Sequence, residues 1–74
     1  MDPTTLKAID DFRKAVKRLL DVTKVSYDIA GDRVDFKTLS NTRKGETLYK
    51  IYQLEMALMD ACPLLKFDFT VIFS

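Results

Sequence analysis

The chain has 74 residues, and its twelve basic and eleven acidic side chains leave a net charge of +1. This balance gives no bulk positive field of the kind that drives nucleic acid binding by counterion release. One cysteine excludes an intrachain disulfide, and the absence of histidine removes the imidazole that would activate a thiol or complete a zinc site. We expect a single, soluble, intracellular domain over residues 1–74, without cofactor, metal or membrane span. A core of this size supplies only about 3–5 kcal/mol of net stability, which favours association with other copies.

The first predicted element is an amphipathic helix over residues 3–22. Asp2 is a good N-cap, and Pro3 suits the first helical position because its missing N–H would have no partner there. Apolar residues recur at steps of three and four and form one stripe: Leu6, Ile9, Phe12, Val16, Leu19 and Leu20. Four basic residues line one side of this helix: Arg13, Lys14, Lys17 and Arg18. This basic cluster is either a solvated helix face or a contact for DNA or an acidic partner.

A β-hairpin is predicted over residues 25–38. The apolar period changes to two at Val25, and Gly31-Asp32 forms a two-residue turn in which Gly31 can take positive φ. This turn makes the apolar residues of the two strands meet on one face, and a slip of one residue would lose the match. The expected partners are Val25 with Thr38, Tyr27 with Phe36, Ile29 with Val34 and Ala30 with Arg33.

A second helix is predicted over residues 42–61, after the capable N-caps Ser40, Asn41 and Thr42 and before Pro63. Its core face comprises Leu48, Ile51, Tyr52, Leu58 and Met59. Tyr49 and Met56 form an additional apolar strip, which belongs either to the core or to an interface. Glu55 lies within the core face, so its carboxylate reaches the rim, accepts from Tyr27 or a basic side chain, or makes a polar contact between subunits. Cys62 is expected to be a small buried residue at the helix end.

The segment 65–73 has strong β character, with Leu65, Phe67, Phe69, Val71 and Phe73 on one face. Such a strand is an aggregation hazard when it is free. It therefore joins the hairpin of its own chain or the sheet of a neighbour. The expected fold class is α+β, with two helices packed on a hairpin in the order α-β-β-α and an additional C-terminal strand.

No catalytic motif is present in the sequence. We find no phosphate-binding glycine loop, no nucleophile elbow and no cluster of cysteine and histidine with metal-ligand spacing. The carboxylates follow the turns and solvated faces of the predicted elements. We therefore expect a protein that is not an enzyme.

Two short motifs resemble those of the head-to-tail joining protein W family of tailed bacteriophages. Residues 31–36 (GDRVDF) are similar to the family's Gly-x-Arg-Val-acid-aromatic strand, and residues 49–55 (YKIYQLE) are similar to its Lys-x-Ile-x-x-Leu-Glu helix. The similarity covers about residues 4–60. It implies two helices against a hairpin and a structural role, in which many copies form a ring at the capsid portal. The family typically has a polar tail where this chain has the 65–73 strand.

These observations lead to two expectations of function. The first is a homo-oligomeric head-tail connector in the virion, with portal or tail proteins as partners and with contact to DNA a weaker expectation. Its expected interface residues are Tyr49, Glu55, Met56, Phe67, Phe69, Val71 and Phe73. The second is a small protein-binding module in the host cytoplasm, similar to an antitoxin or inhibitor, which docks a partner by its sheet edge.

Overall fold

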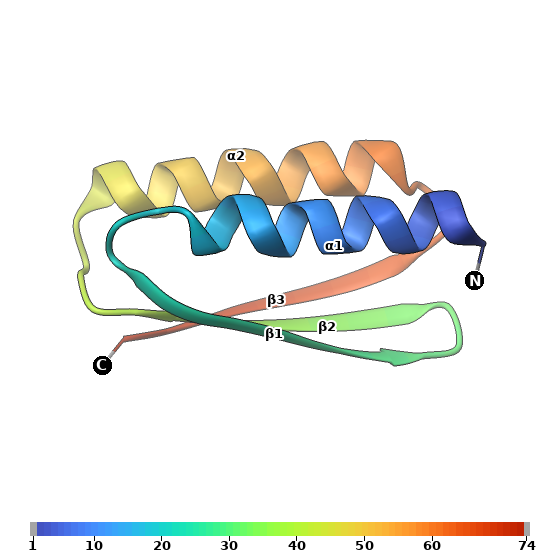
Figure 1. The fold of residues 1–74 in the computed structure, drawn as a ribbon, viewed down its shortest axis with the longest axis horizontal. Helices are drawn as coiled ribbons and strands as arrows, with labels where there is room; N and C mark the ends of the chain where they lie inside the picture. The colour runs from blue at the N-terminus through green and yellow to red at the C-terminus, as the bar shows by residue number, and fades with distance from the viewer. Residues whose placement is uncertain (1, 74) are drawn as a thin grey trace.

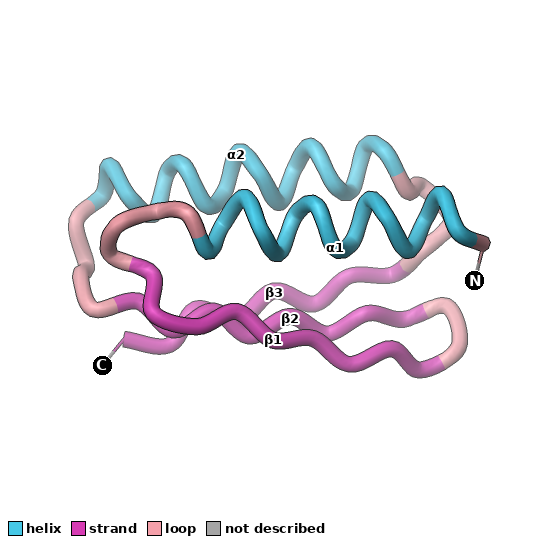
Figure 2. Tube along the Cα trace, in the orientation of Figure 1, coloured by secondary structure: helices cyan, strands magenta, loops and turns pink. Residues whose placement is uncertain are grey.

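The computed structural model describes residues 2–73 and shows two helices packed on one face of a three-stranded sheet (Figures 1 and 2). Along the chain the elements are α1 (Pro3–Lys17), β1 (Val22–Ala30), β2 (Arg33–Ser40), α2 (Gly45–Ala61) and β3 (Lys66–Phe73). The fold is therefore of the predicted α+β class, with a β-hairpin and a C-terminal strand.

The hairpin has the predicted register. β1 and β2 are antiparallel, and every expected pair is found: Val25 with Thr38, Tyr27 with Phe36, Ile29 with Val34 and Ala30 with Arg33. Gly31 has a φ of 63°, as a primed turn requires. The strands are longer than predicted because a bulge between Val22 and Lys24 lets the pairing continue as far as Ser40.

The C-terminal strand joins the sheet of its own chain. β3 pairs in parallel with β2, so β2 is the central strand in the order β1-β2-β3. A parallel connection needs a crossover, and α2 provides it on the face that α1 also covers. The amide of Lys66 donates to the carbonyl of Asp32 at 2.8 Å, which fixes the start of β3 beside the hairpin turn. The sequence left open whether this strand pairs with its own hairpin or with the sheet of a neighbour, and the structure places it in its own sheet.

The core lies between the helices and the inward face of the sheet. The ring of Phe36 is almost fully buried at its centre, with its centroid 4.7 Å from that of Phe12, 5.4 Å from that of Tyr27 and 5.5 Å from that of Phe69. These contacts join β2 to α1, β1 and β3. The other strongly buried apolar residues are Ile9, Val16, Val22, Val25, Val34, Ile51, Leu58 and Cys62.

Three residues expected in an interface between copies are instead part of the chain's own packing. Phe67, Phe69 and Val71 are partly buried and pack against the core. The period of two along β3 places them on the face that the helices cover, and this corrects the expectation. Phe73, at the end of the strand, is 37% exposed, and the guanidinium of Arg43 lies 5.1 Å from its ring centroid.

Both helices are shorter than predicted. α1 ends at Lys17 rather than at residue 22, and Leu20 is 96% exposed although its spacing fits the stripe. Val22 is needed as the first buried residue of β1, and this tertiary pairing outweighs the helical pattern. α2 begins at Gly45 rather than at residue 42, with Lys44 as a cap that has no side-chain bond. Thr42 accepts instead from the Lys44 amide at 3.2 Å.

We predict that Phe69→Ala lowers the free energy of unfolding by about 2–3 kcal/mol, because it removes a partly buried ring that contacts three others. Thr70→Ala on the outward face of the same strand is the matched control and should change it by less than about 0.5 kcal/mol. Urea unfolding at low protein concentration measures both. Equal effects of the two substitutions would contradict the packing of β3 in its own sheet.

Candidate functional site

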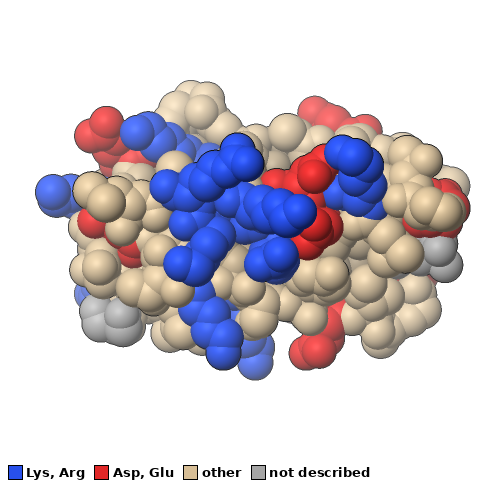
Figure 3. Space-filling model, viewed as in Figure 1, with Lys and Arg blue, Asp and Glu red and all other residues tan. Residues whose placement is uncertain are grey.

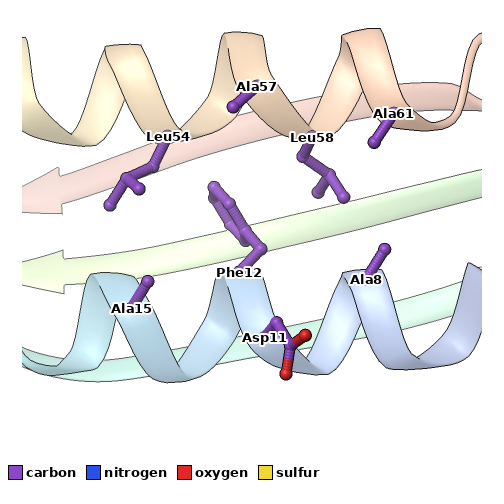
Figure 4. Close-up of a pocket in the computed structure, with 8 residues that line it drawn as sticks. All are labelled: Ala8, Asp11, Phe12, Ala15, Leu54, Ala57, Leu58 and Ala61. Carbon is purple, nitrogen blue, oxygen red and sulfur yellow. The ribbon is translucent and has the colours of Figure 1, made fainter.

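A shallow apolar groove runs between the two helices. It has a volume of about 250 Å³, and small side chains on both helices leave it open (Figure 4). Its lining consists of Ala8, Asp11, Phe12, Ala15, Leu54, Ala57, Leu58 and Ala61. Asp11 is the one titratable residue among them, and its carboxylate pairs with Lys7 at 2.7 Å. The groove therefore presents a mainly apolar surface with one carboxylate at its side.

The face of the sheet opposite the helices is polar over most of its length, with the apolar pair Leu39 and Ile72 near one end. Asp28, Asp35 and Asp68 form one row across the three strands. Arg33 donates to Asp35 at 2.9 Å and to Asp68 at 3.0 Å, so it offsets the repulsion between neighbouring carboxylates. In residues 2–73, no group of three or more His, Cys, Asp or Glu side chains is placed to hold a metal ion.

Arg13 and Lys17 lie on the side of α1 that faces away from α2, Lys14 lies next to them, and Arg18 is the C-cap residue that follows the helix. Figure 3 shows Lys and Arg side chains gathered over the C-terminal half of α1 and continuing toward the sheet. Arg13 and Lys14 both bind Asp10 at 3.0 Å, and these bonds, with that of Lys14 the stronger influence, hold the pKa of Asp10 below its usual value. In the described chain, neither Lys17 nor Arg18 has an acidic partner within ion-pair distance. The free positive charge of the cluster is therefore concentrated at the end of α1.

An exposed apolar strip runs along α2. It consists of Tyr49, Tyr52, Met56 and Met59, which are 61%, 56%, 41% and 44% exposed. The steps of three, four and three residues place all four on one side of the helix. Leu54, Ala57 and Leu58 face α1, so the helical repeat puts this α2 strip on the opposite side. Because α1 contacts β1, the strip lies on the flank of the molecule that ends in the free edge of β3.

Glu55 lies on the same side of α2, three residues after Tyr52 and four before Met59. Its side chain is about half-buried, and this burial raises the pKa of its carboxyl. Within residues 2–73, no hydrogen bond or ion pair to Glu55 is found, so the alternative in which its carboxylate accepts from Tyr27 or a basic side chain is not realised within the described chain. Tyr27 lies on β1 and packs against Phe36. The carboxylate is thus partly desolvated without compensation.

The sequence-based expectation missed two members of the strip. Tyr52 and Met59 fit the core face by spacing, yet both are exposed. The signal that identifies them is the breadth of the apolar surface of α2, which exceeds what one sheet and one neighbouring helix can cover. Cys62 is buried at the end of α2, as expected. None of the described helices is long and apolar enough to cross a membrane.

Comparison with protein family models, with curated proteins and with solved structures finds no match to this chain. The resemblance of residues 31–36 and 49–55 to the head-to-tail joining protein family therefore stays a prediction.

We predict that Glu55→Gln stabilises the isolated chain at pH 7 by less than about 1 kcal/mol, since the charge is partly screened by solvent. The raised pKa means that ionising Glu55 costs stability. This cost is absent below the unfolded value of 4.5 and grows as the pH rises through the folded value. Thermal unfolding of dilute protein at pH 4 and pH 7 measures the effect.

The control is Glu46→Gln in the first turn of α2, where a negative charge favours the helix dipole. This substitution should leave stability at pH 7 unchanged or slightly lower. A loss of stability in Glu55→Gln at pH 7 would show that the carboxylate has a favourable partner within the chain.

Proposed function

We propose that the protein is a non-catalytic assembly protein that acts as a homo-oligomer, of the bacteriophage head-to-tail connector type. The main support is the α2 strip, in which two tyrosines and two methionines are exposed on one helix. Aromatic residues and methionine are enriched at protein interfaces, and a continuous apolar patch is costly to leave in water. The partially desolvated Glu55 on the same side adds a second group that gains from a partner.

The connector assignment draws on the two motifs and their positions in the fold. Residues 31–36 form the hairpin turn and the first part of β2, and residues 49–55 lie within α2. Helix, hairpin and helix thus follow the order that the resemblance implies. β3 is an addition to that plan, and it covers one side of β2 while leaving the outer edge of β1 open. In this proposal the ring of copies belongs to the virion and meets portal or tail proteins.

A regulatory module that docks one partner is the second candidate. The outer edges of β1 and β3 carry backbone groups without a strand partner in the described sheet, and an extended peptide can add to such an edge. This candidate predicts a chain that does not self-associate and that protects the amides of one edge strand from hydrogen exchange when its partner binds. DNA binding through the basic cluster would show a steep fall of affinity with salt.

Size-exclusion chromatography with light scattering tests the proposal. We expect the wild-type chain to form oligomers as its concentration rises, and Met56→Lys to raise the dissociation constant at least about tenfold because it places a charge in the α2 strip. Gln53→Lys, on the same helix but off the strip, is the matched control and should assemble like the wild type. A strict monomer at high concentration would contradict the proposal.

Neighbouring genes give an independent test. Terminase, portal and tail genes beside this one would support the connector assignment. A partner gene in a two-gene cassette would favour the regulatory module.

A further inference from the structure

The two flanks of the molecule differ in charge, and each ends in a sheet edge that has no strand partner in the described chain. One flank ends in the free edge of β3 and carries the α2 strip with Glu55. The other ends in the free edge of β1 and carries the basic cluster of α1. We infer that a second copy of this chain docks head-to-tail, with the α2–β3 flank of one copy against the α1–β1 flank of the next. This inference rests on the proposed function and specifies which surfaces meet.

Strand direction is compatible with such a contact. β3 runs parallel to β2, whereas β1 runs antiparallel to it. When the sheet of one copy continues into the next in the same orientation, β3 and the neighbour's β1 therefore meet as antiparallel strands. Antiparallel pairing gives straight hydrogen bonds between facing residues, and both edges would gain backbone partners.

The position of the helices brings opposite charges together. Figure 4 shows Leu54 of α2 opposite Ala15 of α1, and Ala61 opposite Ala8. The two helices are antiparallel, and their residues correspond at the same height along the two axes. Glu55 is accordingly level with residues 13–14 of α1. In a neighbour displaced sideways along the sheet, α1 would run beside α2 and bring Arg13 and Lys17 toward Glu55. Burial in the contact would strengthen the attraction between these groups.

A two-fold contact through the same flank is less favourable. It would place the α2 helices of two copies against each other and bring two Glu55 carboxylates together in a partly desolvated space. It would also leave Lys17 and Arg18 without acidic partners. The head-to-tail contact instead uses each group once and repeats from copy to copy, so it forms a ring if the rotation closes and a filament if it does not.

Two variants that block one flank each test this inference. Tyr52→Lys adds a positive charge to the α2–β3 flank, opposite the basic cluster of the neighbouring copy, and Lys17→Glu places a negative charge on the α1–β1 flank, opposite Glu55. Both positions are exposed, so circular dichroism should show folded chains. Light scattering should show that each variant alone associates at least about tenfold more weakly than the wild type.

Mixing the two variants gives the decisive result. The Tyr52→Lys chain keeps its α1–β1 flank and the Lys17→Glu chain keeps its α2–β3 flank, so one wild-type contact remains. The two altered flanks carry opposite charges and attract each other, so the mixture should associate more tightly than either variant alone. Lys37→Glu, on the outward face of the central strand β2 and away from both flanks, is the control and should assemble like the wild type.

Three outcomes would overturn the inference or the proposal beneath it. Normal assembly of Lys17→Glu beside weakened assembly of Tyr52→Lys would show a two-fold contact and leave the proposed oligomer standing. Two weakened variants that associate no more tightly when mixed would also overturn the head-to-tail contact. A wild-type chain that stays monomeric would overturn both the contact and the proposed function.

Discussion

The aromatic packing around Phe36 joins most elements of the fold in one core. The ring of Phe36 lies on the central strand and contacts rings from α1, β1 and β3, so four of the five elements meet at one buried side chain. Such a core is possible because β2 has a partner on each side and the helices cover one face only. This arrangement leaves some apolar and hydrogen-bonding surface at the outside of the molecule without a partner. Two helices suffice to cover three strands, but none of residues 2–73 covers the far side of α2 or the outer edges of the sheet.

Local chemistry predicted the hairpin because two independent constraints agreed. Gly31 supplied the positive φ of the turn, and the alternating residues matched across the strands in a single register. The end of α1 was mispredicted because Leu19 and Leu20 continue the helical spacing, whereas Val22 is required by the sheet. Spacing records which residues are apolar, and only the tertiary pairing determines where the helix stops.

The placement of β3 could not be derived from its own residues. Alternation from Leu65 to Phe73 shows that one face is buried, but it does not distinguish the edge of β2 from the edge of a neighbour's sheet. The same ambiguity affected the candidate site. Tyr49 and Met56 were identified as additional to the core face. Tyr52 and Met59 were assigned to that face because periodicity does not measure how much surface a partner covers.

Stability and association make opposite demands on Glu55. Its burial without a partner costs the isolated chain stability, and a neighbour's Arg13 or Lys17 would turn this cost into an attraction. A group that is unfavourable in the free chain and favourable in a contact is a means of specifying one contact over others. In the proposed contact, this is the role of the carboxylate on an otherwise apolar side of α2.

Cysteine cross-linking tests the head-to-tail contact most directly. Arg13→Cys and Glu55→Cys chains, made separately, are mixed under mild oxidation and separated on a non-reducing gel, with the wild-type chain as the control for the buried Cys62. The account predicts a covalent dimer in the mixture and little in either variant alone. If Glu55→Cys alone forms a covalent dimer and the mixture gives no higher yield of dimer, the head-to-tail contact is contradicted.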